Sequence, residues 1–117
     1  MSGIVSYLAG QAAEDIVASD YERRGLPIVA RRWRGSGGEI DLIARLDDGY
    51  VFIEVKKSRA HSAAAAQLRP AQMQRIYRAA SEFIARSPTG QDTNVRFDAV
   101  LMDASGTLDV IENAFGH

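Results

Sequence analysis

Two apolar segments separated by a tight-turn sequence constrain the fold of this chain more than any other feature. Residues 39–46 and 50–57 are rich in branched and aromatic hydrophobic residues, and Asp47-Asp48-Gly49 lies between them. Runs of this kind on either side of an Asp-Gly turn are typical of a β-hairpin. The sequence therefore predicts two adjacent antiparallel strands near the middle of the chain.

The predicted hairpin carries ionisable residues inside its otherwise apolar strands. Because side chains alternate between the two faces of a strand, Glu39 and Asp41 share one face of the first strand. Glu54 and Lys56 share one face of the second strand in the same way. The alternation places apolar neighbours on the opposite faces, namely Ile40 and Leu42 on the first strand and Ile53 and Val55 on the second.

The length of the hairpin loop decides whether these charges meet. A two-residue loop at Asp47-Asp48 places Asp41 opposite Glu54. A two-residue loop at Asp48-Gly49 instead places Asp41 opposite Lys56. A three-residue loop would put the charges on opposite faces of the sheet unless a bulge intervened. Two of the three simple registers therefore bring the ionisable side chains onto one face.

Further helices and strands are predicted on both sides of the hairpin. Apolar residues recur at helical spacing in residues 6–24 and 70–86, where Gly25 suits a helix end and Pro70 a first helical turn. Strands are expected at residues 28–34, 95–102 and 107–111, with loops at residues 35–38, 58–69 and 87–94. The order αβββαββ predicts one mixed α/β domain over residues 1–117.

The composition excludes several classes of protein. The 117 residues contain no cysteine, which rules out disulfides, thiolate zinc sites and cysteine nucleophiles. No apolar run approaches the roughly 18 residues of a membrane span. Residues 1–20 contain no Lys or Arg, and so lack the basic start of a secretory signal. A cytoplasmic protein without a membrane partner is therefore expected.

Two carboxylates on neighbouring strands favour a metal site. Such carboxylates oppose each other's ionisation, and a divalent cation removes that conflict. Asp41 and Glu54 can bind Mg²⁺ or Mn²⁺, and the Val55 carbonyl can add a third oxygen. Lys56 can orient or deprotonate a water, or stabilise charge on a phosphate. The pattern predicts metal-assisted phosphodiester hydrolysis, and its alternative is a solvated sheet face with cross-strand ion pairs.

A set of short motifs occurs in order along nearly the whole chain. It comprises Gly10, Ala13-Glu14, Gly25, Arg32-Trp33-Arg34, Gly37 to Ala44, Val51 to Lys56, Pro70, Arg75, Arg96 to Asp98 and Asn113 to Phe115. Asp41 followed by Glu54-Val55-Lys56 resembles the PD-(D/E)xK nuclease signature, and the full set resembles the small bacterial YraN-like family. The chain departs from these patterns at Ile40, where the signature has proline, and at Gln72, where the family has a basic residue.

This resemblance implies a restriction-endonuclease-like αβββαβ core, with a mixed sheet flanked by helices and the site on the second and third strands. It implies a metal-dependent endonuclease in which Asp41, Glu54 and Lys56 are catalytic. Similarity to archaeal Holliday-junction resolvases adds Glu14 as a further ligand or as an orienter of a ligand water, the alternative being an ordinary surface acid. DNA, including branched or damaged DNA, is the implied substrate, and a homodimer is implied by analogy alone.

Basic residues around the predicted site are candidates for holding a phosphate backbone. The predicted nucleic-acid contacts are Arg32, Arg34, Lys57, Arg59, Arg69, Arg75 and Arg78. The alternatives are a charged edge strand with Trp33 in the core and a solvated face on the second helix. A non-catalytic nucleic-acid-binding or assembly module on the same fold would keep these residues without hydrolysing anything.

Two other features are assigned structural roles. Asp98 lies in a predicted strand between Phe97 and Ala99, so it is expected to pair with an arginine. The glycine-rich residues 35–38 lack the strand–loop–helix context of a phosphate loop. A turn or flexible loop is expected there.

Overall fold

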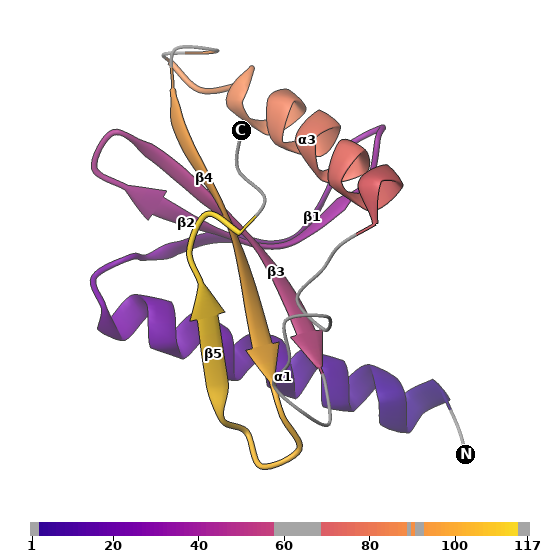
Figure 1. Cartoon of the computed structure of the whole chain (residues 1–117). Helices are drawn as coiled ribbons and strands as arrows, with labels where there is room; N and C mark the ends of the chain where they lie inside the picture. Colours follow the sequence, from indigo (N-terminus) through magenta and orange to yellow (C-terminus); the bar gives the residue numbers. More distant parts are fainter. Residues whose placement is uncertain (1–2, 58–68, 89, 91–92, 115–117) are drawn as a thin grey trace.

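The computed structural model describes residues 3–57, 69–88, 90 and 93–114 (Figure 1). Its elements are α1 (Gly3–Arg23), β1 (Ile28–Arg34), β2 (Glu39–Leu46), β3 (Gly49–Lys57), α3 (Pro70–Ile84), β4 (Asn94–Met102) and β5 (Leu108–Ile111). The expected order of helices and strands is confirmed, and the ends of the predicted elements are shifted by no more than three residues.

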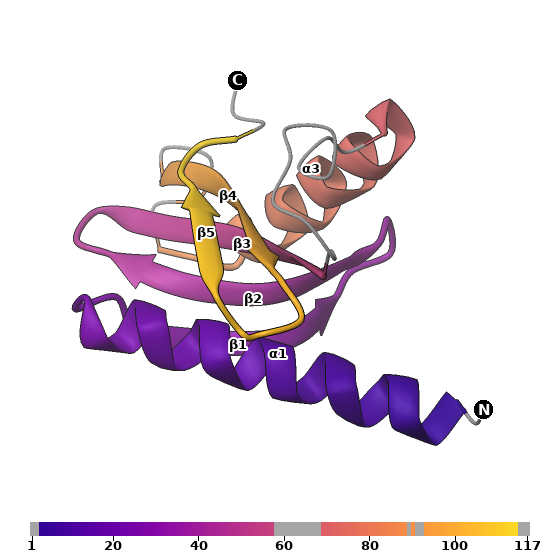
Figure 2. The ribbon, with the colours of Figure 1, turned by 60° about the horizontal axis from the view of Figure 1, so that its bottom comes forward.

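The five strands form one mixed sheet in the order β1-β2-β3-β4-β5. Strands β3 and β4 are parallel, whereas the other neighbouring strands are antiparallel. A parallel pair needs a crossover connection, and the connection between these two strands contains α3. Helix α1 covers one face of the sheet and α3 the other (Figures 1 and 2). The mixed sheet flanked by helices agrees with the expected αβββαβ core.

Each face of the sheet has its own apolar cluster. Under α1, Val17, Ala18 and Tyr21 pack with Leu42, Ala44, Val51, Ile53 and Val100. Under α3, Ile76, Ala79, Ala80 and Ile84 pack with Ile40, Ile43, Phe52, Phe97 and Ala99. Trp33 lies against the second cluster and meets Phe83 edge to face at a ring-centroid distance of 5.4 Å. The core position considered for this tryptophan is therefore correct.

The β2–β3 hairpin adopts the first of the registers considered above. Leu46 pairs with Gly49, so the loop consists of Asp47 and Asp48 alone. Gly49 also pairs with Asn94 of β4, where a Cβ added to the glycine would lie 1.7 Å from the Asn94 carbonyl oxygen. Only glycine fits this close approach of two strands.

Regular alternation fails in β2 at Asp41, contrary to the prediction that Ile40 and Leu42 share a face. Ile40 packs in the cluster under α3, whereas Leu42 packs in the cluster under α1. The irregularity is matched across the sheet, because Arg32 of β1 has a left-handed backbone with φ of 48°. A local distortion of two paired strands can therefore return Trp33 and Ile40 to the α3 face.

Neither helix in the described ranges combines the length and apolar character needed to cross a membrane.

Candidate metal centre

Strands β2 and β3 part at the position where the predicted acidic residues begin. The last backbone pair of the ladder in this direction is Leu42 with Ile53. Beyond it, the Asp41 N–H donates to Glu54 Oε2 at 3.3 Å, and the Val55 N–H donates to Asp41 Oδ2 at 2.8 Å. Each carboxylate therefore accepts a backbone donor of the opposite strand. Residues 41 and 54 are brought together as the sequence predicted.

Both carboxylates of this acidic pair, Asp41 and Glu54, lie in surroundings that oppose their negative charge. The Glu54 residue is only 6% exposed, and its burial together with the charge of Asp41 raises the pKa of its carboxyl. Burial also raises the pKa of Asp41, and the nearby charges of Glu14 and Glu39 act in the same direction. Two backbone N–H donors thus offset only part of the cost of removing two charges from water.

Lys56 follows the acidic pair on β3, in the position that the sequence predicted. Its Nζ donates to Oε1 of Gln72 on α3 at 3.4 Å. Its positive charge lowers the pKa of both Asp41 and Glu54, although less than burial raises them. Among the described residues neither carboxylate forms an ion pair with a lysine or arginine. The cation nearest to the pair in sequence is therefore held beside it by a neutral side chain of α3.

The other acidic candidate, Glu14, lies on α1 and is paired with Arg32. The Arg32 Nε donates to Glu14 Oε1 at 3.0 Å, and the Glu14 side chain is only 14% exposed. Glu14 is near enough to Asp41 to raise its pKa. Within the described ranges, however, no three acidic or histidine side chains are close enough together to hold one metal ion. Glu14 is thus an electrostatic neighbour of the acidic pair.

The predicted basic contacts fall into two groups. Arg32 and Arg34 of β1 are held by acidic residues, Arg34 through a 2.9 Å contact with Glu39. By contrast, Lys57 at the end of β3 is exposed, as are three arginines around α3 that form no ion pair with other described residues. These three arginines are Arg69, Arg75 and Arg78. The remaining candidate, Arg59, lies outside the described residues.

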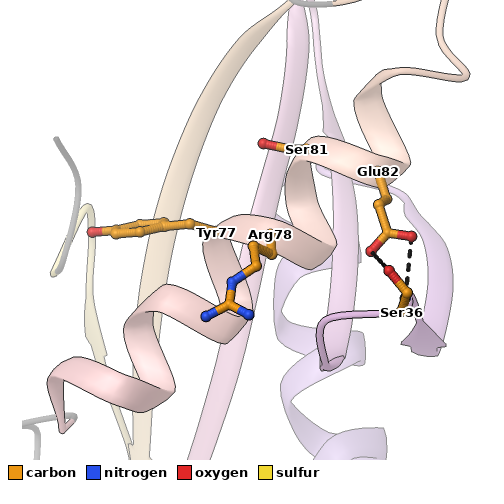
Figure 3. Close-up of a pocket in the computed structure, with 5 residues that line it drawn as sticks. All are labelled: Ser36, Tyr77, Arg78, Ser81 and Glu82. Atoms are coloured by element: carbon orange, nitrogen blue, oxygen red, sulfur yellow. Dashed lines mark hydrogen bonds between the residues drawn. The ribbon is translucent and has the colours of Figure 1, made fainter.

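The glycine-rich segment between β1 and β2 is a turn, one of the two forms expected from the sequence, in which the Gly35 N–H donates to the Gly38 carbonyl, and it is fixed to α3. Glu82 accepts hydrogen bonds from the Ser36 N–H and the Ser36 hydroxyl (Figure 3). It also accepts one from the Gly37 N–H. A Cβ added to Gly37 would lie 2.8 Å from the Arg78 Cβ. The glycines predicted a loop here from the sequence. Its partner Glu82 is 46 residues away from Ser36, and no local sequence pattern predicts that contact.

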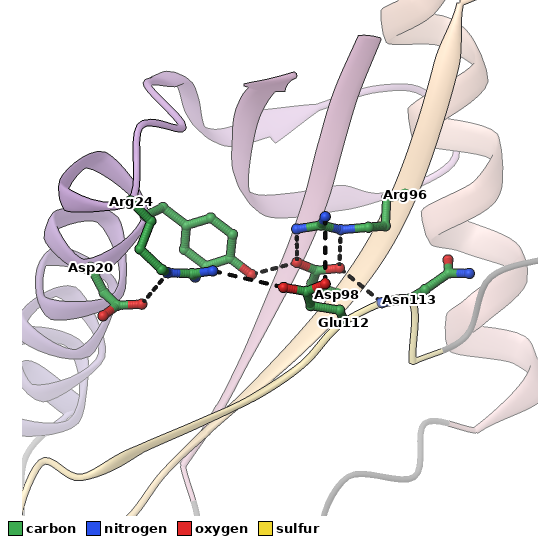
Figure 4. Close-up of polar contacts among 7 residues, drawn as sticks. Asp20, Arg24, Arg96, Asp98, Glu112 and Asn113 are labelled. Carbon is green, nitrogen blue, oxygen red and sulfur yellow. Dashed lines mark hydrogen bonds and ion pairs between the residues drawn. The ribbon is translucent and has the colours of Figure 1, made fainter. Parts of the chain in front are cut away.

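A second buried acid lies elsewhere in the sheet and is fully partnered. Asp98 is 0% exposed and accepts from Arg96 Nε and Nη2 at 2.9 and 3.0 Å. The Tyr21 hydroxyl donates to it at 2.7 Å and the Asn113 N–H at 2.9 Å. Figure 4 shows this group, which is extended by Glu112, Arg24 and Asp20. The predicted structural role and arginine partner of Asp98 are confirmed, whereas sequence reasoning missed Tyr21.

The chemistry of the acidic pair suits a hard divalent cation. Mg²⁺ and Mn²⁺ prefer oxygen ligands and are commonly bound through one or two carboxylates, with water or substrate oxygens completing the shell. A buried and a half-buried carboxylate whose pKa values are both raised gain most from such a cation, since it removes their repulsion. The residues present therefore fit the metal that the sequence analysis expected.

Comparison with known proteins places the chain among relatives that it matches over nearly its full length. The sequence model described as "Uncharacterised protein family UPF0102" matches residues 13–102. A UPF0102 protein of Cereibacter sphaeroides is 62% identical over 115 residues, which cover 98% of each chain. A UPF0102 protein of Ruegeria pomeroyi is 56% identical, covering 98% of this chain and 94% of the relative. A third, from Dinoroseobacter shibae, is 44% identical over 111 residues, covering 95% and 83%.

Proposed function

This chain belongs to the uncharacterised protein family UPF0102, and we propose that it is a metal-dependent endonuclease that hydrolyses phosphodiester bonds in DNA. The observation that carries the proposal is the acidic pair, in which the buried Glu54 and the half-buried Asp41 are held together where β2 and β3 part. A structural role gives no reason for this arrangement, because it places two mutually repelling acids in the sheet without a cationic partner among the described residues.

Asp41 and Glu54 would hold the cation, and the Val55 carbonyl is the proposed third oxygen. When bound, Mg²⁺ or Mn²⁺ supplies charge stabilisation to a phosphodiester and makes a bound water more acidic. The two residues contribute fixed geometry to this site, since each carboxylate is tied to the other strand through a backbone N–H. The burial of Glu54 limits the access of bulk water to its carboxylate oxygens.

Lys56 is the proposed catalytic cation. It lies two residues after Glu54 on the same strand, and Gln72 of α3 holds its ammonium group. An ammonium group in this place can orient the attacking water and stabilise the negative charge that develops on the phosphate oxygens. Gln72 is neutral, so the positive charge of Lys56 acts on the acidic pair and lowers the pKa of both carboxyls, which favours this role.

The exposed bases around α3 are the proposed contacts for the DNA backbone. Lys57, Arg69, Arg75 and Arg78 are exposed, and Arg75 and Arg78 stand where the glycine-rich loop packs on α3. Uncompensated guanidinium groups bind phosphates through paired N–H donors. Contacts of this kind give affinity without sequence preference, so structure-selective substrates such as branched or damaged DNA fit the proposal.

The test is a cleavage assay on single-stranded, duplex, flapped and four-way-junction DNA, with Mg²⁺, Mn²⁺ or EDTA. Cleavage is expected only with metal, and a loss of at least about 100-fold is expected in Glu54→Gln and Lys56→Ala. Lys56→Ala is expected to retain most DNA binding. Asp47→Asn is the matched control, because Asp47 is an exposed acid at the opposite end of the same hairpin. Wild-type cleavage by Lys56→Ala would contradict the catalytic assignment.

A second candidate is a non-catalytic nucleic-acid-binding or assembly module. It is favoured by the absence of a group of three metal-ligating side chains among the described residues. DNA binding without cleavage of any of the four substrates, in Mg²⁺ and in Mn²⁺, would select this candidate. Neither binding nor cleavage would exclude both.

A further inference from the structure

Arg32 occupies an unusual place directly beside the acidic pair. Its neighbours Arg31 and Trp33 pair with Leu42 and Ile40 of β2, which places Arg32 across from Asp41 in the same register. Its φ of 48° lies in the left-handed region, which an arginine rarely adopts. A backbone of this kind persists only where surrounding contacts enforce it, and it is common at functional sites.

The side chain of Arg32 is directed to Glu14 on α1. The two side chains are 33% and 14% exposed, so their charges are only partly screened by water. The neighbouring pair on the same two elements, Arg31 with Asp15, has side chains that are 48% and 67% exposed. A cavity of about 230 Å³ lies between these elements and is lined by both ion pairs and Gln11. The Arg32–Glu14 pair is therefore the more buried of the two ion pairs, and Arg32 is the arginine that faces Asp41.

We propose that Arg32 is a positioning residue that sets the divalent-cation affinity of the acidic pair by neutralising Glu14. This inference rests on the proposed metal site and adds a regulator to it. Glu14 contributes a negative charge close to Asp41, and this charge attracts a cation bound at Asp41 and Glu54. The positive charge of Arg32 weakens that attraction. The ion pair thereby keeps metal affinity at an intermediate value.

The proposal has a signature that a purely structural ion pair does not have. Removing the charge of Arg32 leaves Glu14 uncompensated, so a divalent cation is attracted more strongly. Removing the charge of Glu14 takes one negative charge away from the site, so a divalent cation is attracted less strongly. The two partners of one ion pair are therefore expected to change metal affinity in opposite directions. Loss of a structural contact would instead disturb the site in the same direction from either side.

The test measures Mn²⁺ binding to the full chain without DNA, by titration calorimetry and by electron paramagnetic resonance of free Mn²⁺. Arg32→Asn removes the charge, and asparagine tolerates a left-handed backbone. It is expected to bind Mn²⁺ about fivefold more tightly than wild type, whereas Glu14→Gln is expected to bind it about fivefold more weakly. Arg32→Lys should restore the wild-type affinity. Arg31→Gln, the control in the neighbouring pair, should change the affinity by less than about twofold.

The outcomes separate this inference from the proposed function. Suppose first that Glu54→Gln abolishes Mn²⁺ binding, as the proposed metal site requires. The inference is then overturned if Arg32→Asn and Glu14→Gln change the Mn²⁺ affinity in the same direction, or if neither changes it. Unchanged Mn²⁺ binding by Glu54→Gln would overturn the metal site and the inference together. If Arg32→Asn does not fold, tighter or unchanged binding by Glu14→Gln still overturns the inference. Weaker binding by that variant, with Asp15→Asn unchanged, supports it.

Discussion

Two buried acidic sites lie in the same sheet, and they are partnered in opposite ways. Asp98 is fully buried, but it accepts two guanidinium N–H groups, a phenol hydroxyl and a backbone N–H. Glu54 is also buried and Asp41 half-buried, yet within the described part of the chain each accepts one backbone N–H from the other strand and forms no ion pair. Asp98 is thus paired with a guanidinium group, whereas the acidic pair has the charge of Lys56 nearby without a direct ion pair among the described residues.

This difference distinguishes a contact that is expected to stabilise the fold from one that is proposed to bind a ligand. A buried charge whose partners are complete holds elements together, and the partners of Asp98 come from α1, from β4 and from the segment after β5. A buried pair of like charges costs free energy and persists where a ligand compensates it. The Asp98 site is therefore expected to govern folding, whereas the acidic pair is expected to govern binding and chemistry.

The largest effect is expected from removing the charge of Asp98. Asp98→Asn leaves Arg96 with no carboxylate at its guanidinium group except a 3.7 Å contact to Glu112. Breaking a buried pair from one side is expected to lower the free energy of unfolding by about 3 kcal/mol. Urea denaturation followed by circular dichroism measures the change. Asp109→Asn, at an exposed position of β5, serves as control with a change below about 0.5 kcal/mol.

If Asp98→Asn lowered the free energy of unfolding by less than about 1 kcal/mol, the proposed difference between the two sites would be wrong, because Asp98 would then tolerate the loss of its charge. The same variant is expected to keep the metal dependence of any DNA cleavage, since none of the contacts described for Asp98 involves the acidic pair.

A smaller change in the free energy of unfolding is expected from pH, and it comes from the acidic pair instead of Asp98. Burial and the charge of Asp41 raise the pKa of Glu54 to about 8, above its ordinary value of 4.5. Between these values the folded protein binds more protons than the unfolded chain, so the free energy of unfolding falls as pH rises. The stabilising contribution is complete below pH 4.5 and is lost as pH passes through 8. A loss of about 2 kcal/mol between pH 5 and 9 is expected in metal-free buffer.

Denaturation curves at several pH values, with EDTA and with Mn²⁺, measure this dependence. Mn²⁺ should restore stability mainly at the alkaline end, where the carboxylates are ionised and no longer bind protons. Glu54→Gln should flatten the profile and abolish the effect of Mn²⁺. A wild-type profile that rises between pH 5 and 9 without metal would contradict the view of the acidic pair as an uncompensated site.

The sequence predicted the acidic pair well because its signals are local. The Asp-Asp-Gly turn predicted the hairpin, and its two-residue loop gives one of the registers considered, which brings Asp41 and Glu54 together although regular alternation fails at Asp41. Branched and aromatic runs likewise placed β1 and β2 with their observed ends. The order of elements gave the mixed sheet, because a helix between β3 and β4 allows a parallel pair.

The remaining features depend on contacts between distant residues. Glu82 holds a loop that precedes it by 46 residues, and Tyr21 reaches Asp98 across 77 residues. The failure of the face prediction for Ile40 has the same origin, because the local distortion of β2 is matched by the left-handed backbone of Arg32 on another strand. Contacts between residues so far apart in the chain leave no periodic pattern in the sequence. The roles of Lys56, the α3 arginines and Glu14 in binding or catalysis stay predictions.

The smallest effect is expected from Tyr21→Phe, which removes the hydroxyl that donates to Asp98 and also contacts Arg24. Burial and the hydrogen bond to Asp98 raise the pKa of the Tyr21 phenol, so it remains a donor at any ordinary pH. The variant keeps the ring and its packing against α1's cluster, while Asp98 retains both contacts to Arg96 and the Asn113 N–H. We expect a loss of about 1 kcal/mol in the free energy of unfolding, measured by urea denaturation. The loss should shrink in the Asp98→Asn background, since a neutral acceptor gains less from the phenol. An equal loss in both backgrounds would mean that the Tyr21 hydroxyl stabilises the protein through a partner other than the Asp98 carboxylate, such as Arg24.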